Sequence, residues 1–180
     1  MPLAQLITPQ QLAERLDAPK LVILDCRFAL EDVDYGQRSY AQGHIAGAHF
    51  ADLDRDLSGP VSKGRTGRHP LPDAQRLVAR LREWGLDNDS EVVLYDDGPG
   101  AFAARAWWLL AWLGKRSGVA ILDGGLKAWH AANLPLSLDP PPKREGNFKG
   151  EPDARLLIDA DHLGKRLGLS LIHISEPTRQ

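Results

Sequence analysis

Cysteine is almost absent from this sequence, which holds one such residue, Cys26, among its 180 positions. A single thiol excludes an internal disulfide and any zinc cluster built on cysteines. Histidine is also sparse, and its six copies show no metal-ligand spacing. His44 and His49 come closest, but no acidic motif accompanies them. The sequence therefore predicts no metal site.

Long apolar runs and a strong net charge are lacking as well. No apolar run approaches the about 20 residues that a membrane-spanning helix needs. The net charge of −2 gives no reason to expect a polyanionic partner such as nucleic acid. The first five residues lack the charged and apolar regions of a signal peptide. We therefore expect a soluble, cytoplasmic protein with room for one full domain and little more.

Short apolar runs alternate with amphipathic segments along the first 132 residues. Such alternation predicts an α/β fold, a parallel sheet with helices on both faces. The expected strands are residues 21–25, a short strand that includes Phe50, residues 92–95 and residues 119–122. The expected helices run from a Thr8 cap to about 16, around 37–42, from an Asp73 cap to 84, over 101–113, and from 125 to about 132. The polar, Gly- and Pro-rich residues 51–72 predict a long loop.

Residues 91–108 read as a strand, a tight turn and a helix. Such a turn points several backbone N–H groups at one place beside a helix N-terminus, which suits an anion or a thiolate. A nucleophile would stand just after the strand, yet that position holds Asp96. We expect Asp96 to cap the loop Asp96–Ala101 and its helix, because a carboxylate accepts the same N–H groups.

The same loop fits a dinucleotide fingerprint, since Gly98, Gly100 and Ala103 follow a strand and Asp123 ends the next one. Two features oppose this reading. Pro99 removes a backbone donor from the loop, and a dinucleotide fold needs two βαβαβ halves, which this chain does not show. NADH binding at micromolar affinity would favour this alternative.

Several segments, in order, resemble the N-terminal domain of the two-domain rhodanese-type sulfurtransferases. The resemblance covers roughly residues 1–168 and rests on residues 24–28 (LDCRF), 43–48 (GHIAGA), 67–72 (GRHPLP), 93–98 (VLYDDG), 103–108 (AARAWW) and 122–129 (LDGGLKAW). It implies a rhodanese-like domain with a parallel sheet of about five strands. It also implies that a C-terminal domain carries the catalytic cysteine, which accepts sulfur as a persulfide, and that the active site lies between the domains.

On this resemblance, Asp96 occupies the cysteine slot and the chain matches the half without a nucleophile. The implied parent enzyme moves sulfane sulfur from thiosulfate or 3-mercaptopyruvate to cyanide or a thiol, without an organic cofactor. Its partners would be a small sulfur donor and the missing C-terminal rhodanese domain, and this chain alone would be inactive. The donor preference stays open, because the catalytic loop sets it. The alternative is a non-catalytic binding or regulatory module; a cysteine-dependent phosphatase is disfavoured by the absent loop cysteine.

The resemblance and composition together divide the chain into four parts. Residues 1–138 form the rhodanese-like domain, and the proline run within 139–153 predicts a stiff, extended linker. Residues 154–168 resemble the truncated start of a second rhodanese domain. Residues 169–180 match nothing in the family and resemble translated sequencing-adapter sequence. We hypothesise that the natural reading frame was interrupted near Gly168.

Four further features invite a functional reading. His44 and Arg105 are possible cleft-facing residues, although His44 sits in a turn that it can fix by hydrogen bonding, and Arg105 favours an internal ion pair. Cys26 lacks a Gly-rich turn after it, so we expect a buried, packing role. The acidic residues Asp52, Asp54 and Asp56 predict a solvated face. The basic stretch of Lys63, Arg65, Arg68 and His69 predicts surface, or an interface to the absent domain.

Overall fold

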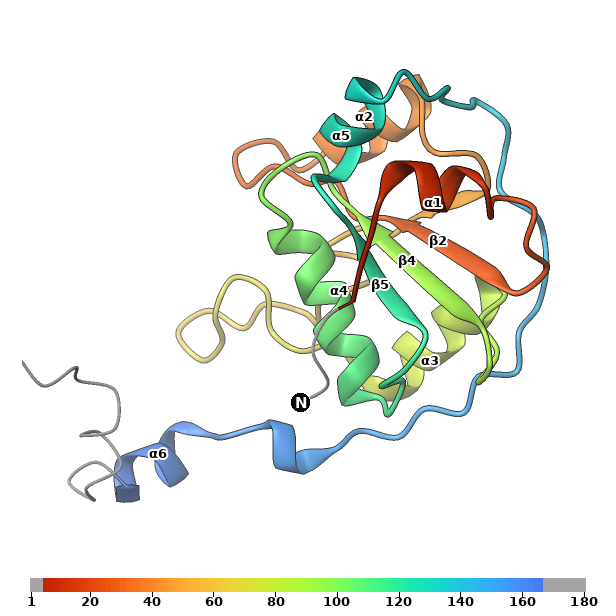
Figure 1. The fold of residues 1–180 in the computed structure, drawn as a ribbon. Coiled ribbons are helices and arrows are strands. Elements are labelled where there is room, and N and C mark those ends of the chain that lie inside the picture. Colours follow the sequence, from red (N-terminus) through yellow and green to blue (C-terminus); the bar gives the residue numbers. More distant parts are fainter. Residues whose placement is uncertain (1–4, 167–180) are drawn as a thin grey trace, which may run out of the picture.

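A five-stranded, all-parallel sheet organises the part of the chain that the computed structural model describes, residues 5–166. Helices cover both faces of the sheet (Figure 1). The strands are β1 (Gln5–Ile7), β2 (Leu21–Asp25), β3 (Ala48–Phe50), β4 (Glu91–Tyr95) and β5 (Val119–Leu122). The helices are α1 (Pro9–Ala13), α2 (Tyr35–Gln42), α3 (Ala74–Glu83), α4 (Ala101–Trp112), α5 (Gly125–Ala131), a 3₁₀ turn η1 (Ala154–Leu156) and α6 (Ala160–Arg166).

The strand order β1-β5-β4-β2-β3 creates a switch point between β2 and β4. From β2 the chain crosses to β3 on one side, and from β4 it crosses to β5 on the other. Ligands of open α/β sheets bind outside the carboxyl ends of the strands at such a point. Here that edge is formed by the residues that follow Asp25 and Tyr95, which are register partners in neighbouring strands.

Two apolar layers hold the sheet between its helices. Val22 and Leu24 of β2 face α3 and α4, whereas Ile23 between them faces α1 and α5. This alternation follows from the two-residue period of a strand. Trp129 of α5 is fully buried in the second layer, and its indole N–H donates to the Pro135 carbonyl at 3.0 Å. The predicted parallel sheet with helices on both faces is confirmed.

Local capping explains where the helices begin. Thr8 and Gln11 form a reciprocal capping box at the start of α1, and the Asp73 side chain accepts from the N–H of Arg76 at the start of α3. The predicted strands match β2 and β5 at both ends and β4 within one residue. The strand β1 was not identified from the sequence, because it has only three residues and two of them are exposed.

Residues 139–153 contain no helix or strand. The second half of this segment is held by backbone hydrogen bonds to α3 and the turn that follows it. The N–H of Gly146 donates to Arg82 O at 2.8 Å, and Phe148 N–H donates to Leu86 O at 3.0 Å. The Phe148 ring is 2% exposed within the α3–α4 layer. We call residues 144–153 the strap. The strap is thus bonded and packed against α3 and α4, while η1 and α6 continue beyond it (Figure 1). The predicted tail of residues 169–180 lies outside the described residues.

Candidate functional site

The Asp96 carboxylate fills the backbone cradle after β4. Its Oδ1 accepts the N–H groups of Gly98 at 3.0 Å and Gly100 at 3.1 Å. Its Oδ2 accepts those of Phe102 at 3.0 Å and Ala103 at 3.1 Å. Asp96 is 1% exposed. The predicted loop therefore exists, and the side chain at the nucleophile position satisfies four donors that would otherwise serve an external anion or a thiolate.

This arrangement also bears on the dinucleotide alternative. A pyrophosphate would need the N–H groups at the start of α4. Those donors already bond to Asp96, and Gly100 reaches its position with a positive φ of 85° as the N-cap of α4. Gly125 packs so close to the Asp96 carbonyl that an added Cβ would lie 2.3 Å from it. The loop is thus closed by its own residues, which argues against a dinucleotide site.

A buried ionic network occupies the switch point beside this loop. The Arg27 guanidinium donates to both oxygens of Asp25, at 2.6 Å to Oδ2, and also to the Gly43 carbonyl at 2.7 Å. The Tyr95 hydroxyl donates to Asp25 Oδ2 at 2.8 Å and accepts from Ile45 N–H at 3.2 Å. Burial, followed by the Asp25 charge, raises the pKa of Tyr95 well above its usual value. The network ties the ends of β2 and β4 together.

Cys26 lies between Asp25 and Arg27 in the sequence, and its side chain is buried. It is 1% exposed and belongs to the α3–α4 layer. Burial raises the pKa of the Cys26 thiol well above its ordinary value, and the Asp25 and Asp96 charges add to the effect. A thiol in this setting is protonated and is therefore a poor nucleophile. The geometry supports the packing role expected for Cys26.

His69 and Asp54 form a pair that the sequence did not reveal. The His69 Nδ1 lies 3.1 Å from Asp54 Oδ1. The Phe28 ring meets the imidazole edge-on, with centroids 5.8 Å apart. The other ring nitrogen, Nε2, is buried and has no hydrogen-bond partner among the described residues. With the Nδ1 proton donated to Asp54, Nε2 presents a lone pair. A buried polar atom without a partner costs free energy, so Nε2 is the atom in this region that most needs an external partner.

Arg105 anchors the segment that carries His69. Its guanidinium donates to the carbonyls of Leu57, His69 and Pro70, and to the Ser58 hydroxyl. The internal ion pair expected for Arg105 is wrong, because the described structure gives it no carboxylate partner. The reason is local: residues 51–72 form neither helix nor strand, so their buried carbonyls need donors from elsewhere.

The acidic residues beside this segment build a turn. Asp52 Oδ1 accepts the N–H groups of Asp54 and Arg55, each at 2.9 Å, and Asp56 Oδ2 accepts the N–H of Asp52 at 3.0 Å. Asp52 is 6% exposed, and the Asp56 carboxylate contacts Arg80 at 2.9 Å. The predicted solvated face is therefore wrong for Asp52 and Asp56. Their side chains hold Asp54 where it meets His69.

His44 is enclosed by its own domain. It is 2% exposed and stacks on Tyr40 with ring centroids 3.9 Å apart. Its Nδ1 and Nε2 lie 3.0 Å from the carbonyls of Tyr40 and Asp139, and its backbone pairs with Ser137. The possible cleft-facing role of His44 is thus not what the structure shows. The ring instead joins α2 to residues 137–139.

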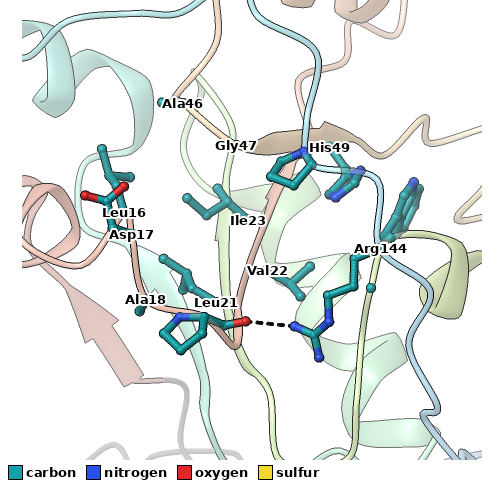
Figure 2. A pocket seen from close by; sticks show the side chains of 14 residues that line it. Leu16, Asp17, Ala18, Leu21, Val22, Ile23, Ala46, Gly47, His49 and Arg144 are labelled. Carbon is teal, nitrogen blue, oxygen red and sulfur yellow. Dashed lines mark hydrogen bonds between the residues drawn. The ribbon is translucent and has the colours of Figure 1, made fainter.

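A separate cavity of about 320 Å³ lies at the opposite end of the sheet, where β2 begins (Figure 2). Leu21, Val22 and Ile23 line it, and two further lining residues are joined by the hydrogen bond from Arg144 of the strap to the Pro19 carbonyl. His49 also lines the cavity, and burial together with the Arg80 charge lowers its pKa to about 4. The cavity is remote from Asp96 along β2 and β4, and it shares no lining residue with the His69 region.

No group of three or more His, Cys, Asp or Glu side chains is arranged to hold a metal ion within residues 5–166. No helix in this range is long and apolar enough to cross a membrane.

Comparisons with known proteins agree with this geometry. A family model described as the rhodanese-like domain matches residues 8–132. The chain is 66% identical over 165 residues to a probable 3-mercaptopyruvate sulfurtransferase of Pseudomonas aeruginosa, covering 92% of the chain and 58% of that relative. It is 41% identical over 166 residues to a putative thiosulfate sulfurtransferase of Mycobacterium tuberculosis, covering 92% of the chain and 55% of that relative.

Among solved structures, the crystal structure of SseA from Escherichia coli, described among 3-mercaptopyruvate sulfotransferases, superposes with a TM-score of 0.79. That match has 30% sequence identity and covers 93% of this chain and 63% of the other. The chain thus spans somewhat more than half the length of these two curated relatives, and it corresponds to their N-terminal domain.

Proposed function

Since the chain belongs to the rhodanese-like domain family, we propose that it is the nucleophile-lacking half of a sulfurtransferase. The complete enzyme would move sulfane sulfur from thiosulfate or 3-mercaptopyruvate to cyanide or a thiol, through a persulfide on a cysteine of a second rhodanese domain. The similarity to relatives named for both donors supports the reaction class. This chain alone would be inactive.

The observation that carries the proposal is the carboxylate of Asp96 inside its own N–H cradle. Sulfur transfer needs a thiolate held by such donors. Four N–H groups bond to Asp96, and the only cysteine in the sequence, Cys26, is buried with a raised pKa. The described domain therefore offers no thiolate in a reactive position. A second domain must supply the nucleophile.

His69 and Asp54 give this half a chemical contribution of its own in the proposed enzyme. When a thiolate attacks the sulfur of 3-mercaptopyruvate, the carbon–sulfur bond breaks and its electron pair leaves as the pyruvate enolate, which takes up a proton. The substrate thiol supplies the proton: an imidazole that is oriented by a carboxylate can take it from the sulfur on its free nitrogen and return it to the enolate carbon, leaving the persulfide as its anion. Asp54 orients the ring through Nδ1, and Nε2 is left for the partner domain.

A complementation assay tests the proposal. The chain is assayed alone and as a covalent fusion to the part of the P. aeruginosa relative that it does not cover. Thiocyanate formation from thiosulfate and cyanide and pyruvate release from 3-mercaptopyruvate are measured separately. We expect turnover by the fusion and none by the chain above a thiol-free control. Turnover by the chain alone, or a folded fusion that is inactive with both donors, would contradict the proposal.

The second candidate function is a non-catalytic binding or regulatory module. The closed Asp96 loop and the strap favour it, because the loop satisfies its own N–H donors and the strap completes the α3–α4 core layer. A chain that is stable and monodisperse alone, together with an inactive fusion, would make this reading the stronger one.

A further inference from the structure

Arg105 links the Asp96 loop to the segment that presents His69. Its Nε and NH2 groups donate to the Leu57 carbonyl at 3.1 and 2.9 Å. The same NH2 group lies 3.1 Å from the carbonyls of both His69 and Pro70, and 3.2 Å from the Ser58 hydroxyl. We infer that Arg105 is a positioning residue, which holds the His69 ring in the orientation that the partner domain requires. This inference rests on the proposed function for its purpose, but its geometry stands apart from it.

The link continues on the other side to Asp96. Asp96 Oδ2 accepts the N–H groups of Phe102 and Ala103, which fixes the first turn of α4. Arg105 lies in the same helix, two residues after Ala103, so fixing the first turn also fixes the place from which its side chain extends. The loop that lacks a nucleophile therefore serves as the rigid base from which the His69 segment is held. Asp96 then acts on the site through the helix start and not through chemistry of its own.

A guanidinium suits this task better than an ammonium. Residues 51–72 contain neither a helix nor a strand that could hold them in place. Two stretches of this segment that are distant in sequence, 57–58 and 69–70, both contact the Arg105 guanidinium. Arginine has five N–H donors in a planar fork and can serve several carbonyls at once, whereas lysine presents one small charged group. The Arg105→Lys exchange should therefore keep the positive charge but lose the simultaneous hydrogen bonds to residues 57–58 and 69–70.

The simpler reading is that Arg105 only stabilises the domain. The two readings differ at the His69 ring. A merely structural arginine would affect unfolding but not the Nδ1 contact with Asp54 in the folded protein. Arg82 provides a matched control, since its Nε donates to the Phe148 carbonyl at 2.8 Å and so joins α3 to the strap, in a contact that includes no residue of the 57–70 segment.

The test uses the full chain with Arg105→Lys, Arg105→Gln and Arg82→Gln. Two readouts are taken on each folded protein: the ¹⁵N NMR signature of the His69 ring, which reports the Nδ1 proton held by Asp54, and hydrogen exchange of amides 57–70. We expect both Arg105 variants to lose the ring signature and to exchange roughly tenfold or more faster in that segment. Arg82→Gln should lower overall stability and leave both readouts at His69 unchanged.

An unchanged His69 signature in Arg105→Gln, or in Arg105→Lys where the Gln variant does not fold, overturns the inference. An equal change in Arg82→Gln also overturns it, because the effect would then be general. The outcome is separable from that of the proposed function, since neither readout needs turnover. In an active fusion, Arg105→Lys should lower kcat and leave KM unchanged. An inactive fusion with a responsive His69 ring would reject the sulfurtransferase proposal and keep the positioning role.

Discussion

The Asp54 carboxylate meets Nδ1 of His69 at 3.1 Å, although neither residue lies in a helix or a strand. The His69 side chain is 18% exposed in this pair. A second histidine–carboxylate pair, His162 with Asp159 at 2.9 Å, lies at the start of α6 with both side chains mostly exposed. The Asp54 side chain is 44% exposed, so the same two groups occur once as a half-buried pair at the candidate site and once mostly in solvent, and the more exposed pair serves as a natural comparison.

Replacing His69 should remove activity from the fusion without unfolding it. His69→Asn leaves no proton-handling group opposite the second domain, and we expect a loss of about 10²–10⁴-fold in kcat with 3-mercaptopyruvate. Asp54→Asn should cost less, because the ring remains but its orientation is weaker. His162→Asn is the control and should leave kcat unchanged. Full activity in His69→Asn would remove His69 from the proposed mechanism.

Removing the Asp96 carboxylate should destabilise the domain strongly. Asp96→Ala leaves four N–H donors without their acceptor at a site that is 1% exposed. Because buried donors that lose their partners cost about 1–3 kcal/mol each, and water can reach some of them in the variant, we expect a loss of about 3–5 kcal/mol. Urea unfolding at constant m-value measures it. Asp97→Ala, at the half-buried neighbouring carboxylate, should cost much less; equal losses would contradict the cradle account.

Much of the fold could be predicted because its signals are local. The buried strands are short apolar runs, and Thr8 and Asp73 cap helices through contacts with residues three positions away. The Asp96 loop is likewise local, since all four of its donors lie within seven residues. The strand β1 could not be predicted from the sequence. Its three residues show no strand pattern of their own, and it is held by pairing with β5, more than a hundred residues away.

The remaining site residues depend on contacts that no local pattern encodes. The sequence predicts His69 to be part of a basic surface stretch. In the structure its ring contacts Asp54 across the loop, and its backbone carbonyl accepts a hydrogen bond from Arg105 of α4. Asp52 read as solvated, yet it is buried because it accepts N–H groups of its own turn. The available hint was chemical: one Gly- and Pro-rich loop without secondary structure holds several carboxylates and a histidine. Long loops of that kind are often functional.

Phe148 should anchor the strap to the domain. Its ring is 2% exposed in the α3–α4 layer, and removing a buried phenylalanine side chain costs about 3–5 kcal/mol. We therefore expect Phe148→Ala to lower the free energy of unfolding by that amount. Leu138→Ala, at a residue that is 73% exposed, should change stability by no more than about 0.5 kcal/mol. Urea unfolding of both variants decides, and equal small effects would show that the strap is only a linker.

His49 should titrate well below the ordinary pKa of a histidine side chain. Burial, followed by the Arg80 charge, lowers its pKa to about 4. Because the folded protein then holds the ring neutral while the unfolded chain protonates it near its ordinary value of about 6.5, stability should fall as the pH decreases from 6.5 towards 4. An NMR titration of the His49 ring measures the midpoint directly. Arg80→Gln should raise that midpoint, and a wild-type midpoint near 6.5 would contradict the prediction.

Cys26 should make the domain less stable in alkaline solution. Burial, with the Asp25 and Asp96 charges, raises the pKa of its thiol in the folded protein. Above the unfolded value of about 8.5, the unfolded chain loses the thiol proton and the folded chain keeps it. The unfolded state then binds fewer protons, so the free energy of unfolding falls as the pH rises, by up to about 1.4 kcal/mol per pH unit.

Between pH 8.5 and 9.5 the thiol gives the larger share of this slope, because the unfolded chain ionises its cysteine at about 8.5 and its tyrosines only at about 10. Tyr40, with its pKa raised to about 12, and Tyr95, whose pKa is also raised, add a smaller slope of the same sign. Urea unfolding of wild type and Cys26→Ala at both pH values gives the difference in slope. We expect a clearly smaller slope in the variant, because alanine has no proton to lose and only the tyrosine contribution remains. Native Cys26 should also resist a thiol reagent until the chain unfolds. Rapid labelling of the folded protein, or identical slopes, would mean that the thiol is not held protonated by burial, and Cys26 would then have to be reconsidered as a reactive group.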